Sequence, residues 1–219
     1  MKFYAALMIV YREFIMNEWI TRIWIGSLCL FLAGCAGTPT TSPGAVNSPQ
    51  TLENWQLNAK LAVRDAHDGA IVFMQWKQQG DDYQIELSGS LGQQTTYLYG
   101  NSEQATLIRA NGSKHIAKHP ETLFVQSFGF AVPFSAMKDW VRGLPAHALP
   151  LDKTQLDAQG DVIELGQSGW DITYQNYLII DGYRLPERFE ISHDNLRIKG
   201  FIQTWTLPPQ NLNSTTQTD

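Results

Sequence analysis

The sequence predicts a mainly β fold in which a curved antiparallel meander sheet carries inserted short α-helices. Apolar and polar residues alternate with period two over most of the chain, which is the pattern of half-buried strands. Turns rich in glycine, asparagine and aspartate separate the alternating segments at hairpin spacing. One segment with helical periodicity interrupts the series, and its helices must bury their apolar faces against the sheet.

The strands follow from this alternation in chain order. Alternate residues from Trp55 to Val63 are apolar and define the first strand, with polar residues on its other face. Further strands are expected at Ile71–Gln78, Tyr83–Leu87, Thr95–Tyr99, Thr106–Ala110, Lys114–Ala117, Asp161–Gly166, Trp170–Leu178, Glu187–Ser192 and Arg197–Trp205.

The interrupting segment spans residues 119–145 and predicts two short helices. The first begins at Pro120, because proline is favoured in the first helical turn. The second runs from about Phe134 to Arg142 and ends at Gly143, with apolar residues recurring at three and four. Asp139 and Arg142, three residues apart, are interpreted as a solvated ion pair on this helix.

A sheet curved around such helices creates an apolar concavity, a common form of ligand site. The chain has seven Trp, more than a sheet and two short helices usually need, although core packing is the default for any one of them. The candidate cavity residues are Trp55, Trp76, Leu123, Phe124, Phe128, Met137, Trp140, Val141, Trp170 and Trp205.

The N-terminus has the pattern of a bacterial lipoprotein signal peptide. An apolar run of signal-peptide length, residues 23–32, ends in Leu-Ala-Gly followed by Cys35. An ordinary signal peptide that happens to contain cysteine is the alternative. We expect a signal peptide at residues 1–34 (with Met16 as the alternative start), an acylated Cys35 with a flexible tether at 35–52, a folded domain at 53–206 and a disordered tail at 207–219.

Composition and motifs argue against several function classes. The formal net charge is −5, and the 16 Lys and Arg are scattered, which argues against a nucleic-acid surface. The five His show no metal-ligand spacing, and no nucleophile elbow or phosphate loop occurs. We therefore expect no enzyme, no metal and no cofactor.

The segment Ser88 to Gln93 predicts a turn, in which Leu91 lies between two glycines, Gly89 and Gly92, with no apolar neighbour. Either the loop folds back and buries this leucine, or a partner outside the domain receives it.

These features together resemble the LolB family of outer-membrane lipoprotein receptors. The resemblance covers nearly all of residues 55–205. It rests on "WQLNAKLAVR", "MQWKQQGDDYQIELSGSLG", "HPETLFVQSFGFAVPFSAMKDWVRGLP", "QSGWDITYQNY", "LPERFEI" and "IKGFIQTW", together with the lipobox. Two departures are Ala59, where the family often has Gly, and Ser90, where Pro usually precedes the loop leucine.

The resemblance implies an incomplete antiparallel β-barrel, covered by helices, around a hydrophobic cavity for acyl chains. It implies a monomeric receptor that takes acylated lipoproteins from the periplasmic carrier LolA and inserts them into the outer-membrane bilayer. Leu91, with Gly89 and Gly92, would form its membrane-delivery loop. Ala36 after the acylated cysteine implies the outer membrane, with the anchor in its inner leaflet and the domain facing the periplasm.

Two other functions compete with this one. A structural envelope lipoprotein would act as an assembly scaffold through an exposed sheet edge and would have a filled interior. A lipid-modifying enzyme is disfavoured by the missing catalytic constellation.

Overall fold

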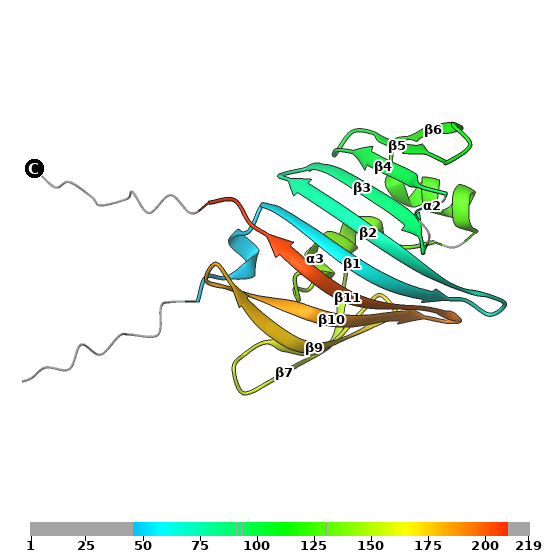
Figure 1. The fold of residues 1–219 in the computed structure, drawn as a ribbon. Coiled ribbons are helices and arrows are strands. Elements are labelled where there is room, and N and C mark those ends of the chain that lie inside the picture. The colour runs from blue at the N-terminus through cyan, green and yellow to red at the C-terminus, as the bar shows by residue number, and fades with distance from the viewer. Residues whose placement is uncertain (1–45, 91, 93, 130, 210–219) are drawn as a thin grey trace, which may run out of the picture. The chain divides into compact units, whose positions relative to one another are not determined.

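The computed structural model describes residues 46–90, 92, 94–129 and 131–209. The chain divides into two compact units, residues 1–43 and 44–219, and every described residue lies in the second. The strands are β1 (Asn54–Arg64), β2 (Gly69–Gln79), β3 (Asp82–Gly89), β4 (Thr96–Gly100), β5 (Ala105–Ile108), β6 (Lys114–Ala117), β7 (Leu151–Leu156), β8 (Val162–Gln167), β9 (Trp170–Ile180), β10 (Tyr183–His193) and β11 (Leu196–Thr206) (Figure 1). A single 3₁₀ turn, η1 (Pro49–Thr51), precedes β1.

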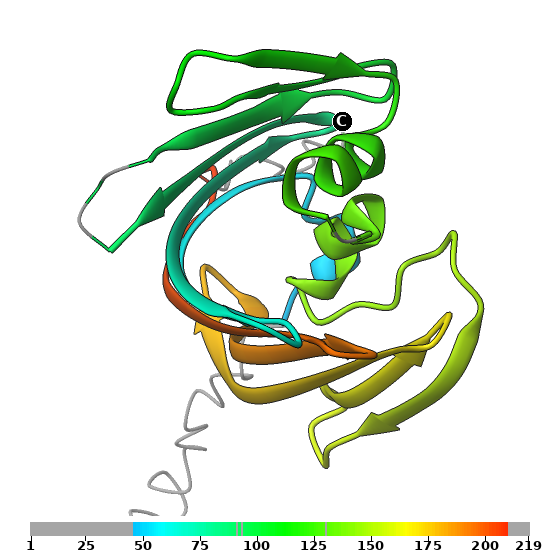
Figure 2. The same ribbon diagram turned by 90° about the vertical axis from the view of Figure 1, so that its right-hand side faces the viewer.

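All strands join one 11-stranded antiparallel sheet in the order β6-β5-β4-β3-β2-β1-β11-β10-β9-β8-β7. The first and last strands pair with each other, so the two halves of the meander meet at the centre of the sheet. The sheet curves strongly, and the segment that connects its two edges, β6 and β7, lies inside the curve (Figure 2). The predicted mainly β meander with inserted helices is confirmed.

The connecting segment forms α2 (Pro120–Phe128) and α3 (Phe134–Trp140). As predicted, α2 begins at Pro120, and Gly129 ends it in the left-handed conformation, with φ 80°. The helix α3 is two residues shorter than predicted, because the chain tightens into turns that end at Gly143 with φ 78°. A Cβ atom at Gly143 would lie 2.6 Å from the Tyr177 hydroxyl, so the close approach also requires glycine.

The hydrophobic core lies between the concave face of the sheet and the two helices. Alternate residues of β1, from Trp55 to Leu61, are buried there as predicted. Other fully buried side chains are Trp76, Leu98, Leu107, Leu123, Trp140, Leu165, Ile172, Leu185 and Ile191. Among the described residues, the core and the side chains packed against it lie between Leu52 and Leu207.

One strand, β7, was not predicted. Its sequence LDKTQL has no run of alternating apolar residues, and all six side chains are exposed in the structure. An edge strand with solvent on both faces has no apolar face for a sequence pattern to reveal. No helix in the described ranges is long and apolar enough to cross a bilayer.

Candidate functional site

The predicted cavity residues gather on the concave side of the sheet. Their described side chains belong to β1, β2, β9, β11 and the helical segment, and pack in or against one core. All are buried except Phe124, which is half-buried; the side chain of Phe128 lies outside the described part. The structure thus brings together residues far apart in sequence. That they line an acyl-chain cavity stays a prediction.

Five aromatic rings surround the start of α3 and are called here the Phe134 cluster: Trp55, Trp76, Tyr83, Phe124 and Phe134. The Phe134 ring lies 5.3 Å from Trp76, 5.0 Å from Tyr83 and 5.6 Å from Phe124, centroid to centroid. Trp55 lies 5.1 Å from Trp76 and extends the cluster across the sheet. Such pairs stabilise mainly by burying apolar area, with a smaller gain from ring geometry.

Two polar atoms in this cluster are buried without a hydrogen-bond partner among the described residues, the Trp55 indole N–H and the Tyr83 hydroxyl. Burial, and secondarily the charge of Glu121, raises the pKa of Tyr83 to about 12. An unsatisfied buried donor costs free energy. The Phe134 cluster is therefore an apolar part of the interior in which two hydrogen-bonding groups lack a partner among the described residues.

The other end of the helical segment is fixed by Gln167, a residue that is 1% exposed. Its Oε1 accepts hydrogen bonds from Trp140 Nε1 at 2.8 Å and from the Ala146 amide at 2.7 Å. Its Nε2 donates to the carbonyl oxygens of Ala146 at 2.9 Å and Leu149 at 3.1 Å. These residues are called here the Gln167 network, and they tie the chain after α3 to β8.

The hydroxyl of Tyr174 donates to the Trp140 carbonyl at 2.8 Å and adds a bond from β9 to the same segment. Burial raises the pKa of Tyr174, so its neutral, donating form is favoured. No catalytic role was predicted for Gln167 or Tyr174, and none follows from these structural bonds.

The interpretation of Asp139 and Arg142 as a solvated pair is wrong. The Arg142 guanidinium is buried, donates to the Pro49 carbonyl at 2.9 Å and the Leu52 carbonyl at 2.8 Å, and pairs with Asp139. Burial lowers the pKa of Arg142, while Asp139 opposes that shift. Arg142 is buried and Asp139 is half-buried, because the guanidinium contacts the chain around η1 about ninety residues away in sequence, a contact that helical spacing does not reveal.

A pocket of about 630 Å³ opens at the end of the sheet where the β1–β2 and β10–β11 turns meet the α2–α3 connection. Its apolar lining includes Val132, Trp170 and Leu196, all buried core residues. The His193 ring stacks on Trp170 at 4.8 Å, and its Nδ1 lies 2.9 Å from the Gly169 carbonyl oxygen. This mouth pocket places solvent-accessible space directly beside the core.

The rim of the mouth pocket carries charge. Asp65, Glu121 and Asp194 line it together with His67 and His193. Hydrogen bonds from the amides of Asp68 and His67 lower the pKa of Asp65, which holds the β1–β2 turn. The rim is therefore acidic, while the floor is apolar.

The predicted turn before β4 is present, because the Gly92 amide donates to the Gly89 carbonyl at 2.9 Å and Gly92 has φ 68°. Leu91 and the predicted lipidation site Cys35 lie outside the described residues. Within the described part, no group of three His, Cys, Asp or Glu side chains is arranged to hold a metal ion.

These features define a class: a curved antiparallel-sheet domain whose aromatic interior is closed by two helices. The family described as "Outer membrane lipoprotein LolB" matches residues 53–205, and the chain belongs to this family.

Curated relatives agree with this assignment. The outer-membrane lipoprotein LolB of Nitrosococcus oceani is 33% identical over 81% of this chain and 93% of its own length. That of Pseudomonas fluorescens is 35% identical over 82% of this chain and 92% of its own length. Among solved structures, a LolA superfamily protein of Nitrosomonas europaea aligns with a TM-score of 0.46 and 8% identity, over 73% of this chain and 88% of that protein.

Proposed function

We propose that this protein is an outer-membrane receptor for lipoproteins. Anchored through acylated Cys35 in the inner leaflet, it accepts lipoproteins from the periplasmic carrier LolA, holds their acyl chains against the concave face and inserts them into the membrane. It works as a monomer, without a cofactor and without catalysing a reaction.

The observation that supports this function best is the aromatic concave face beneath two helices, with a pocket opening beside it. The sheet members of the Phe134 cluster, which are Trp55, Trp76 and Tyr83, are covered by the helical segment rather than by a second sheet. The described side chains pack together there, so acyl chains enter by displacing rings or moving the helical segment. The mouth pocket gives them a route to the core.

The chemistry of the cargo explains why such an interior is needed. Each methylene transferred to water costs about 0.8 kcal/mol. A triacylated lipoprotein with some forty methylenes would face a cost on the order of 30 kcal/mol in the periplasm. Transfer between two apolar interiors avoids that cost and requires only a difference in affinity.

A transfer assay tests the proposal. The chain Ala36–Asp219, which retains every described core residue, is mixed with a purified carrier–lipoprotein complex, and the lipoprotein is followed by co-purification. We expect the lipoprotein to move onto this chain. A complex that stays intact would instead favour a structural envelope lipoprotein that binds partners through the exposed edge strand β7.

The proposed delivery loop has a separable test. A leucine inserted in a bilayer contributes only about 1.5–3 kcal/mol, too little to anchor the protein but enough to bring it to the surface. We expect Leu91→Glu to accept lipoproteins from the carrier normally and to fail in inserting them into vesicles. Ser90→Glu, next to it, is the control for added charge. Equal loss of both steps would assign Leu91 to the core.

A further inference from the structure

Cations concentrate on the convex face of the sheet, opposite the aromatic interior. Register places Lys60 beside Phe201, whose other neighbour is Arg188. One row further along, Lys199 pairs with Ala62, and in the next row Arg64 pairs with Arg197. These five side chains, Lys60, Arg64, Arg188, Arg197 and Lys199, are exposed, and they are called here the basic patch.

Acidic groups neutralise this patch only in part, because two carboxylates, Glu187 and Glu190, pair with three of its five cations. Glu190 forms ion pairs with Arg197 and Lys199, each at 3.2 Å, and Asp171 forms one with Lys153 of β7 at 2.9 Å. Glu187 lies 3.7 Å from Arg188. The remaining nearby carboxylates, Asp65 and Asp194, lie on the hairpin turns at one end of the sheet. The net charge of the chain is −5, so the excess of cations in the basic patch separates this surface from the acidic remainder of the protein.

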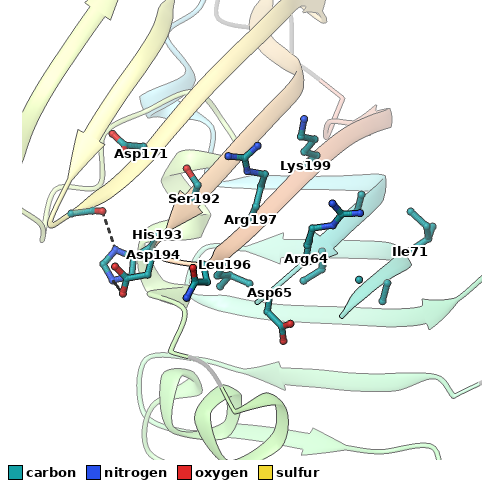
Figure 3. A pocket seen from close by; sticks show the side chains of 16 residues that line it. Arg64, Asp65, Ile71, Asp171, Ser192, His193, Asp194, Leu196, Arg197 and Lys199 are labelled. Atoms are coloured by element: carbon teal, nitrogen blue, oxygen red, sulfur yellow. Dashed lines mark hydrogen bonds and ion pairs between the residues drawn. The ribbon is translucent and has the colours of Figure 1, made fainter. Parts of the chain in front are cut away.

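Apolar side chains accompany the cations. Ile71 is 42% exposed, and the half-buried rings of Phe73 and Phe201 flank Lys60 on the neighbouring strands. The Arg188 guanidinium lies over the Phe201 ring, 4.3 Å from its centroid. Figure 3 shows Arg64, Ile71, Arg197 and Lys199 around the adjoining hollow of about 970 Å³. Long cationic chains with aliphatic neighbours suit the interface of a bilayer, where heads contact phosphate and stems lie on apolar groups.

The chain length before the domain keeps this face near a membrane. The described chain begins at Val46, and Asn47 donates to the Gly182 carbonyl at the end of the sheet where β9 and β10 turn. About eleven residues separate Cys35 from this point, a span of at most about 40 Å. An 11-residue strand such as β1 is about 36 Å long. The convex face therefore stays within reach of the bilayer that holds the anchor.

We propose that the basic patch binds the anionic phospholipid headgroups of that bilayer and orients the domain on it. The inference rests on the proposed attachment through Cys35 for its location, and not on lipoprotein transfer. An acidic protein is the other conceivable occupant. Lipid fits better, because the patch is broad and rich in flexible lysine and arginine, and because the membrane is always within reach.

Flotation with vesicles tests the inference without the anchor. The chain Ala36–Asp219 is mixed with vesicles of phosphatidylcholine alone or with about 30% phosphatidylglycerol. The test variant is Lys60→Glu/Arg64→Glu, since neither side chain is in an ion pair among the described residues. The control, Lys114→Glu/Lys118→Glu, makes the same charge change at exposed positions on and beside β6. Urea unfolding verifies that both variants fold.

We expect binding to the anionic vesicles only, lost near 1 M salt, where the screening length falls to about 3 Å. The test variant lowers the partition coefficient at least about tenfold, and the control lowers it less than about twofold. Equal effects of the two variants, or equal binding to neutral vesicles, would overturn the inference. The inference would also be overturned if the test variant still bound vesicles but no longer took up lipoprotein from the carrier. That result would show that the basic patch binds a protein. Vesicle binding by a chain that accepts no lipoprotein would contradict the proposed function alone.

Discussion

The two ends of the helical segment are held to the sheet by different forces. After α3, the Gln167 network and the Tyr174 hydroxyl fix the chain with buried hydrogen bonds, and Arg142 adds bonds to the segment before β1. At α2 and the start of α3, ring packing in the Phe134 cluster dominates. Two hydrogen bonds at this end lie at or near the surface: Arg109 donates to the Ser127 carbonyl at 2.7 Å, and the Ser135 hydroxyl donates to Glu121.

This difference in bonding indicates which end of the helical segment can move away from the sheet. Buried hydrogen bonds are directional, and breaking them leaves unsatisfied groups, so the Gln167 end opposes movement. Apolar contacts are non-directional, and rings displaced by an acyl chain exchange one apolar neighbour for another. We infer that acyl chains displace the rings of the Phe134 cluster, while the Gln167 end acts as the fixed hinge.

The largest effect is expected from Gln167→Leu. The substitution leaves the Trp140 indole, both polar groups of the Ala146 backbone and the Leu149 carbonyl without their partner. The free energy of unfolding should fall by about 3–5 kcal/mol, measured by urea denaturation. The exposed Gln175→Leu on β9 is the matched control and should change it by less than about 0.5 kcal/mol. Similar values for both would show that the network does not fix this end.

An intermediate effect is expected from Glu121→Ala, which removes the link between α2 and α3. Glu121 Oε1 accepts hydrogen bonds from the Ser135 amide N–H at 2.9 Å and from the Ser135 hydroxyl at 2.7 Å. The loss in stability should be about 1 kcal/mol, and amide hydrogen exchange in α2 should become roughly fivefold faster. Exchange at residues 140–149 should not change. Glu103→Ala in an exposed loop is the control, and uniform acceleration along the chain would contradict the two-ended picture.

The smallest effect is expected from Tyr83→Phe. Because the Tyr83 hydroxyl is buried without a described partner, its removal should leave stability unchanged or raise it by up to about 1 kcal/mol. The folded pKa, about 12, lies above the ordinary value of 10, so stability is present below pH 10 and declines as pH rises toward 12. Spectrophotometric titration should show one late-ionising tyrosine fewer in the variant. A stability loss above about 1 kcal/mol would show that the hydroxyl has a partner.

The fold was predictable because its strands face a core on one side only. Alternation from Trp55 to Leu61 and the turns at glycine identified the strands, and Pro120 and Gly143 marked the helical segment. The edge strand β7 was missed because neither of its faces is buried.

The polar part of the site was the part that sequence did not predict. Glutamine and arginine are usually exposed, so residue type alone does not predict that Gln167 and Arg142 are buried. The one available signal was the position of Gln167 directly before the β8–β9 turn, next to Trp170 in the strand pairing. Contacts between distant parts of the sequence determine whether such polar residues are buried, and local residue spacing does not reveal those contacts.

Photo-crosslinking tests most directly whether acyl chains reach the Phe134 cluster. Phe134→p-benzoylphenylalanine places the reactive group on α3, on the concave side of the sheet, and Ile71→p-benzoylphenylalanine places it on the convex face as the control. Each variant receives a lipoprotein with radiolabelled acyl chains from the carrier and is then irradiated. We predict label on the Phe134 variant and none on the Ile71 variant. Absence of label at Phe134, or equal labelling at both positions, would contradict the account.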